Sequence, residues 1–372
     1  MNLNNIYEFK KKALDFVNSL ETKKDFIYIP VKYGFTKYGL DIELGFSCFA
    51  IKSLYILDEW KNLNHQIQCE WINYLNSFQI KNFEYFPDGS FIDQNYFKFI
   101  NSYSISKETK RQFKKIIYGK NNIKKKEIEV KEFIRAESKQ AISTLYQIKS
   151  ENTIPYVESH FQDLNVERYL NSLNWEKPWN AGAQYAALCV FLETQMKKDK
   201  NYISIKNELL SFSDKISNKE TGCYFLGKPE SSSELINGTM KIISGFDWIN
   251  LPIHYPEQLI DFCLSSTISS YGCDIVDVVY VLFMCSKQTS HRRLEIESYF
   301  DKIEAIIAEH YFSEIGGFSY YKNKSQIYYY GLNITKGKNE PDLHGTTLLL
   351  WAVSLIYEFK NPNQKQFNLI KP

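Results

Sequence analysis

Two aspartates, Asp274 and Asp277, have a spacing that could support proton transfer. They lie three residues apart at the start of an apolar run, 275–283, so a helix would carry both carboxyl groups on one face. In a dry cavity, mutual repulsion and desolvation would keep one of them protonated, as a general acid requires. The alternative interpretation is helix capping, in which carboxylates bind the free N–H groups of a first helical turn.

Asp342 and His344 precede a second apolar run, and Asp342 has the residue type and position of a helix N-cap. A histidine near a helix N-terminus tends to stay neutral, and neutral imidazole can accept a proton or bind a metal ion. A zinc site at His344 would also require Cys273 and one or two acids to converge. The chain has no CxxC or HxxxH spacing, which is typical of such sites.

Three weaker groups of polar and aromatic residues lie at the ends of other apolar runs. His254 and Glu257 are typical of a helix start, and the alternative is an acid–base pair that faces a cavity. Asp247 and Trp248 place a carboxylate beside an indole, which could hold a sugar ring or a cation. Trp179 belongs to a similar cluster of aromatic and polar residues. If these runs are helices around one axis, the groups would gather at its ends.

The elements that would position these residues are repeated helices. Gly182, Gly238 and Gly345 each open a mostly apolar run, and they lie 56 (238 − 182) and 107 (345 − 238) residues apart. Repetition at this scale is typical of an array of helical units. A helix that is apolar on nearly all sides must be surrounded by protein. The sequence therefore predicts inner helices packed around a common axis.

Short turns with glycine before aromatic residues separate the predicted helices. Gly89, Gly222 and Gly317 each precede aromatic side chains, and glycine readily adopts the positive φ that a reversing chain needs. Phe318 and Tyr320, which follow Gly317, are expected to pin this turn and are candidates for a substrate site. An amphipathic helix is expected within residues 1–30, and a buried helix over 39–60.

The composition fits one large helical domain over 1–372, with less regular helices in 1–134 and a repeat-like core in 135–360. Aromatic residues make up 16% of the chain, including 27 Tyr and 26 Phe. They serve either as bulky core residues or as the lining of a cavity for an apolar substrate, a carbocation or a sugar. The net charge of +2 gives no general electrostatic case for nucleic-acid binding.

The distribution of charge and cysteine indicates a soluble cytoplasmic protein. Seven scattered cysteines and no apolar leader segment fit a reducing compartment, and the longest apolar runs are too short to span a membrane. Residues 105–132 are rich in lysine, which is typical of a solvated outer helix. The alternative is a basic patch for a diphosphate or for peripheral contact with an anionic lipid surface.

The turn-plus-helix unit resembles the repeat of the superfamily of terpenoid cyclases and protein prenyltransferase β-subunits, which have the α/α toroid fold. The segment 342–347, Asp-Leu-His-Gly-Thr-Thr, is similar to the prenyltransferase segment that supplies a zinc-binding histidine, and the resemblance implies this role for His344. The chain lacks the Asp-x-Asp-Asp motif of class II cyclases, the repeated Gln…Gly…Trp signature and the Asp-x-Cys pair of prenyltransferases. The resemblance therefore implies the fold more than the activity.

We therefore expect an all-α toroid enzyme that performs acid–base chemistry on an isoprenoid-like substrate, by cyclisation or prenyl transfer. Asp274 and Asp277 would be the acids, and His344 with Asp342 the base or metal ligand. One alternative is a carbohydrate-active toroid (a lyase, hydrolase or epimerase) that uses the carboxylates and imidazole of 247–257 on a glycan. The other is a non-catalytic helical scaffold. The chain has no P-loop, dinucleotide or Gly-x-Ser-x-Gly motif, which argues against nucleotide, nicotinamide and serine-hydrolase chemistry.

Overall fold

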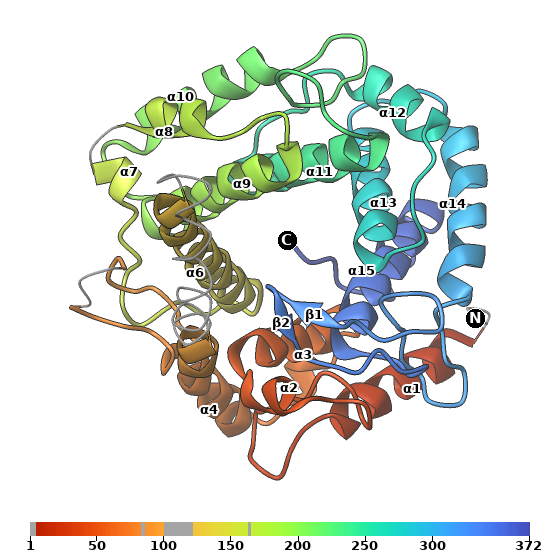
Figure 1. The fold of residues 1–372 in the computed structure, drawn as a ribbon. Coiled ribbons are helices and arrows are strands. Elements are labelled where there is room, and N and C mark those ends of the chain that lie inside the picture. Colours follow the sequence, from red (N-terminus) through yellow and green to blue (C-terminus); the bar gives the residue numbers. More distant parts are fainter. Residues whose placement is uncertain (1–4, 83–85, 100–121, 163–164) are drawn as a thin grey trace, which may run out of the picture.

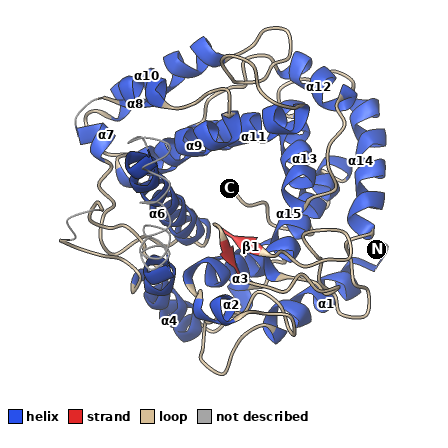
Figure 2. Ribbon diagram, viewed as in Figure 1, coloured by secondary structure: helices blue, strands red, loops and turns tan. Residues whose placement is uncertain are grey.

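The structure is a computed structural model that describes residues 5–82, 86–99, 122–162 and 165–372, and these residues are mainly helical. The prediction of an all-α protein is therefore confirmed. The longer helices form two layers around a common centre (Figures 1 and 2). The inner layer comprises α3 (Leu44–Ile56), α6 (Asn122–Gln147), α9 (Pro178–Gln195), α11 (Ser232–Ile249), α13 (Gly272–Ser286) and α15 (Leu343–Lys360). The outer layer comprises α1 (Ile6–Ser19), α4 (His65–Asn76), α8 (Val166–Ser172), α10 (Tyr202–Ile216), α12 (Pro256–Ser265) and α14 (Arg293–Ala308).

The inner helices contact one another in chain order, from α3 to α15, and α15 in turn contacts α3. This order of contacts encloses the centre of the molecule, as Figure 1 shows. Helix α3 belongs to the part of the chain, 1–134, that was expected to be less regular. The enclosing layer therefore extends beyond the repeat-like region of 135–360.

Inner and outer helices differ in how many of their residues are buried, as the apolar patterns predict. Helix α13 buries nearly every residue from Gly272 to Phe283, because it has protein on all sides. Outer helix α14 buries a single stripe at helical spacing, which consists of Ile296, Phe300, Ile303 and Ile307. Helices α9 and α11 approach closely at two of the repeated glycines. A Cβ atom on Gly182 would lie 2.8 Å from the carbonyl oxygen of Gly238, so a larger residue would push the helices apart.

The buried helix that was expected over 39–60 is divided into α2 (Lys37–Asp41) and α3. The backbone is extended at Ile42, and a carboxylate from elsewhere in the chain then opens the next helix. Oδ2 of Asp93 accepts hydrogen bonds from the backbone N–H groups of Glu43 and Leu44, at 2.7 and 3.1 Å. This long-range cap was not visible in the local sequence. Its effect is to begin α3 after a break of two residues, Ile42 and Glu43.

Short elements complete the fold. A 3-10 helix, η2, spans Trp60–Asn62, and α7 spans Ser159–Gln162. Strand β1 (Tyr328–Tyr329) pairs antiparallel with β2 (Leu332–Asn333), a small hairpin that the sequence analysis did not predict. The last residues of the chain return to the centre, where Figure 1 shows the C-terminal end.

No helix within the described ranges is long and apolar enough to cross a membrane. Most of the lysine-rich segment expected to be a solvated helix or a basic patch, residues 105–121, lies outside the described residues.

Candidate functional site

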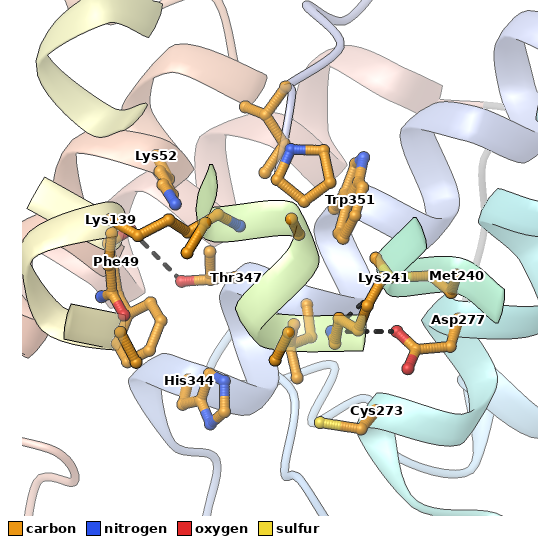
Figure 3. Close-up of a pocket in the computed structure, with 18 of the residues that line it drawn as sticks. Phe49, Lys52, Lys139, Met240, Lys241, Cys273, Asp277, His344, Thr347 and Trp351 are labelled. Carbon is orange, nitrogen blue, oxygen red and sulfur yellow. Dashed lines mark hydrogen bonds and ion pairs between the residues drawn. The ribbon is translucent and has the colours of Figure 1, made fainter. Parts of the chain in front are cut away.

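A cavity of about 220 Å³ lies among the inner helices (Figure 3). All six inner helices contribute to its wall, together with Tyr330 from the hairpin turn and the end of the chain at Ile370 and Pro372. Both polar and apolar side chains line it. The wall comprises Phe49, Lys52, Ala136, Lys139, Gln140, Ala183, Gln184, Ala186, Ala187, Met240, Lys241, Cys273, Asp277, Tyr330, His344, Thr347, Leu348, Trp351, Ile370 and Pro372.

Asp277 is the acidic side chain of this wall. It projects from α13, is only 1% exposed, and its Oδ1 lies 3.9 Å from Nζ of Lys241 (Figure 3). Its Oδ2 has no hydrogen-bond partner among the described residues. Burial raises the pKa of Asp277 to about 7, the charge of Lys241 acts in the opposite direction, and Asp274 adds to the increase. This carboxyl group can therefore gain or lose a proton near neutral pH.

Asp274, the proposed partner of Asp277, does not line the cavity. Its Oδ1 accepts a hydrogen bond of 2.7 Å from Nδ2 of Asn237, and its Oδ2 accepts one from Oγ of Ser269. These bonds occupy both oxygens and tie the first turn of α13 to α11. The two acids share a helix face as the spacing predicts, but only Asp277 reaches the cavity. Of the two predicted acids, Asp277 is therefore the one that can contact a ligand in the cavity, while the charge of Asp274 helps to raise its pKa.

His344 lies in the first turn of α15, with its ring stacked between Phe49 and Tyr320, at 4.4 and 5.6 Å between ring centroids. Nδ1 lies 2.9 Å from Oε1 of Gln326, which only accepts hydrogen bonds, so Nδ1 carries the proton and Nε2 the free lone pair. Burial, and then the charges of two lysines, lower the pKa of His344 to about 3. The imidazole is therefore neutral at physiological pH and presents an acceptor nitrogen.

Asp342 is the N-cap of α15, as one of the two interpretations of its position predicts. Its Oδ1 accepts a bond of 2.7 Å from the backbone N–H of Gly345. Its Oδ2 accepts bonds from the backbone N–H groups of Tyr320, at 2.7 Å, and Gln326, at 3.1 Å. Burial raises the pKa of Asp342 to about 6 against these hydrogen bonds, which lower it. The carboxylate does not line the cavity and acts as a positioning group for Tyr320 and Gln326, which contact His344.

Three lysines of the cavity wall were missed by the sequence analysis. They are Lys52 on α3, Lys139 on α6 and Lys241 on α11 (Figure 3). Burial lowers the pKa of Lys52 to about 8 and that of Lys139 well below its ordinary value. A signal was present, because Lys52 and Lys241 each interrupt an apolar run of a predicted inner helix. A lysine at such a position must either face a cavity or be paired.

The residues proposed for zinc do not form a metal site. Cys273 and Asp277 lie on the same wall as His344, but no group of three or more His, Cys, Asp or Glu side chains is placed to hold a metal ion within the described part of the chain. Burial, and then the negative charge of Asp277, raise the pKa of the Cys273 thiol to about 12. The thiol is therefore protonated and is neither a ready nucleophile nor a ready ligand.

The acid–base pair proposed at 254–257 lies at the start of α12, a helix of the outer layer (Figure 1). Nδ1 of His254 lies 2.9 Å from the hydroxyl of Tyr224, and its Nε2 bonds to Asp214. Glu257 accepts a hydrogen bond of 3.0 Å from Thr289 at an exposed position. Neither side chain lines the cavity, so their proposed role in a central site is corrected to contacts within the outer layer.

The remaining aromatic candidates also lie outside the cavity wall. Trp248 donates a hydrogen bond of 2.9 Å from Nε1 to the carbonyl oxygen of Pro372, and Asp247 lies 3.5 Å from Nζ of Lys371. Both contact the end of the chain. Phe318 is fully buried in the core, and Trp179 is half-buried at the start of α9. Tyr320 is close to the site through its stacking on His344, although it does not line the cavity itself.

Comparison with known proteins finds no matching family model, no matching curated protein and no matching solved structure. The two layers of helices and the central cavity therefore define the class of the protein: a mainly helical protein with a central cavity lined by both polar and apolar side chains.

Proposed function

We propose that this protein is an α/α toroid enzyme that performs acid–base chemistry on an isoprenoid-like substrate in the central cavity. The observation that carries the proposal is Asp277, a buried carboxyl group at the cavity wall whose pKa is raised to about 7. A general acid works best when its pKa lies near the operating pH, because both protonation states are then populated. Perturbed acids of this kind gather at functional sites.

The neighbours of Asp277 give the proposed reaction its other groups. Lys241 is the adjacent cation and stabilises the carboxylate that remains after proton transfer. His344 presents Nε2 as a fixed acceptor, because Gln326 holds its tautomer. Its low pKa makes it a hydrogen-bond acceptor for a substrate rather than a strong base. Asp277 is therefore the proposed proton donor, and His344 the proposed orienting group.

The apolar part of the wall favours an isoprenoid-like substrate. Phe49, Met240, Leu348 and Trp351 are large apolar side chains, and Ala183, Ala186 and Ala187 leave space on α9. Hydrocarbon chains bind to such surfaces through burial of apolar area. The residues proposed for the glycan alternative, 247–257, do not line this cavity. No observation therefore favours the carbohydrate-active function.

The test is turnover of prenyl alcohols and prenyl diphosphates by purified protein, followed by mass spectrometry. Wild type is expected to convert a member of this panel. The substitution Asp277→Asn is expected to lower kcat by about 10²–10⁴-fold, because the amide does not act as a general acid. Asp261→Asn, on the exposed outer helix α12, is the matched control and is expected to keep wild-type turnover. Conversion by Asp277→Asn at the wild-type rate would exclude the acid assignment. Absence of conversion of the whole panel would exclude the isoprenoid class.

A further inference from the structure

The three lysines of the cavity wall converge from separate parts of the chain. Lys52, Lys139 and Lys241 lie on three different inner helices and line the same cavity of about 220 Å³ (Figure 3). Lys52 is buried and Lys139 and Lys241 are half-buried, whereas lysines mostly lie exposed and a buried charge is normally paired. Three such residues around one small space therefore require an explanation.

Their partners within the protein are too few. Nζ of Lys241 lies 3.9 Å from Oδ1 of Asp277, and Nζ of Lys52 lies 3.5 Å from the neutral hydroxyl of Ser143. Among the described residues, Lys139 has neither a hydrogen-bond nor an ion-pair partner, and Asp277 is the one acidic side chain of the cavity wall. Three ammonium groups thus face a single acidic side chain.

The lysines also act on one another and on their neighbours. After burial, Lys52 and Lys241 are the charges that lower the pKa of Lys139, and the same two charges lower the pKa of His344. Like charges that interact in a desolvated space destabilise the protein. A bound anion would replace this repulsion by attraction, so the arrangement is suited to a ligand that carries negative charge.

We infer that Lys52, Lys139 and Lys241 form a binding site for a phosphoryl group of the substrate, as a phosphate or diphosphate ester. Charge favours this class: the side chains of the three lysines and of Asp277 sum to a formal charge of +2 when all are ionised. A phosphate monoester carries a charge of about −1.5 to −2 at pH 7, whereas a carboxylate carries only one negative charge. Lysine binds phosphate well as a point charge.

The inference rests on the proposed function, since it names the charged part of the substrate that enters the same cavity. The apolar wall at Phe49, Leu348 and Trp351 would then hold the rest of that molecule. Within the proposed site the phosphoryl group would lie near Lys241, which is also the neighbour of Asp277. Anion binding would therefore anchor the substrate beside the proposed proton donor.

Calorimetric titration of the full chain at low salt tests the site, with pyrophosphate, inorganic phosphate and acetate as probes. Wild type is expected to bind pyrophosphate at one site per chain and acetate, which carries a single negative charge, at least about tenfold more weakly, as expected for the loss of a charge-assisted contact. Lys139→Met is expected to weaken pyrophosphate binding by about tenfold or more. Lys200→Met, at an exposed lysine outside the cavity, is the matched control and is expected to bind like wild type.

The stability of the ligand-free variant supplies an independent measurement. Lys139→Met removes a repelled, half-buried charge and keeps most of the side-chain volume, so its Tm without ligand is expected to rise. Weaker binding together with a higher Tm cannot result from misfolding. If Lys139→Met does not fold, Lys52→Met carries the same two expectations.

Three results would overturn the inference: no pyrophosphate binding by wild type, equal binding by wild type and Lys139→Met, or acetate binding as tight as that of pyrophosphate. Asp277→Asn separates this test from that of the proposed function. It removes the negative charge of the cavity and is expected to bind pyrophosphate at least as tightly as wild type. Pyrophosphate binding without any turnover would overturn the proposed function alone, whereas turnover without pyrophosphate binding would overturn the inference alone.

Discussion

At the residue scale, the cavity places one aspartate among three lysines, and burial changes the protonation of both kinds of side chain. The pKa of Asp277 is raised to about 7 and that of Lys52 is lowered to about 8, in each case mainly because burial disfavours the charged form. The neutral forms of both groups are therefore accessible at pH values where exposed aspartate and lysine would be fully charged. The same burial that makes them reactive also makes them costly to the stability of the protein.

The pH dependence of stability should reveal this cost at Lys52. The folded protein releases the Lys52 proton near pH 8 and the unfolded chain near pH 10.5, so the unfolded state binds more protons between these values. The contribution of Lys52 to the free energy of unfolding is therefore most unfavourable below pH 8 and becomes less so as the pH rises toward 10.5. Lys52→Met is expected to be more stable than wild type near pH 7.5, and this advantage is expected to shrink near pH 9.5.

Urea denaturation of both proteins at the two pH values measures this change, with Lys200→Met as the exposed control. A constant difference between wild type and Lys52→Met at both pH values would show that Lys52 titrates normally in the folded protein.

At the element scale, the ends of the inner helices fix the site. Helix α15 begins at Asp342, whose carboxylate binds three backbone N–H groups and holds the loop that carries Tyr320 and Gln326. These two side chains in turn contact His344. The orientation of the proposed acceptor nitrogen therefore depends on a helix cap that does not itself line the cavity.

Asp342→Ala is expected to lower the free energy of unfolding by about 2–4 kcal/mol, because it removes an N-cap and leaves further buried N–H groups unpaired. Denaturant unfolding at neutral pH provides the measurement. Asp261→Ala, at a largely exposed carboxylate of α12, is the control and is expected to change stability by less than about 1 kcal/mol. A loss for Asp342→Ala no larger than that of the control would refute the capping role.

The sequence predicted the positions of these helices along the chain better than it predicted which face of each helix points to the cavity. Apolar runs identified the inner helices, and the residue type of Asp342 identified its cap, because both signals are local. The inward position of Lys52 and Lys241 depends on the rotation of each helix about its axis, which packing against neighbouring helices decides. The sequence hypothesis placed His254 and Glu257 at the cavity because they have the pattern of a helix start. A helix start does not reveal whether the helix belongs to the inner or the outer layer. Asp93 caps α3 from a distant segment, which no local pattern reveals.

At the scale of the whole molecule, the site exists because the inner layer closes on itself. Helix α15 contacts α3, and this contact brings Phe49 and His344 into a stack although most of the chain separates them. An open array of the same helices would expose Asp277 and the lysines to water, and their pKa values would then return toward ordinary ones. The protonation of Asp277 therefore reports on closure of the molecule as well as on the proposed chemistry.

The titration of Asp277, followed by NMR of protein labelled with ¹³C at aspartate carboxyl groups, tests the central claim without a known substrate. Wild type is expected to show a carboxyl resonance with a midpoint near pH 7, in agreement with the raised pKa of Asp277, and this resonance is expected to be missing in Asp277→Asn. Asp342, whose pKa is raised to about 6, is expected to keep its own titration in both proteins. If the resonance that disappears in Asp277→Asn titrates near pH 4 in wild type, the carboxyl group is solvated as in an open molecule, and the proposed proton donor is contradicted.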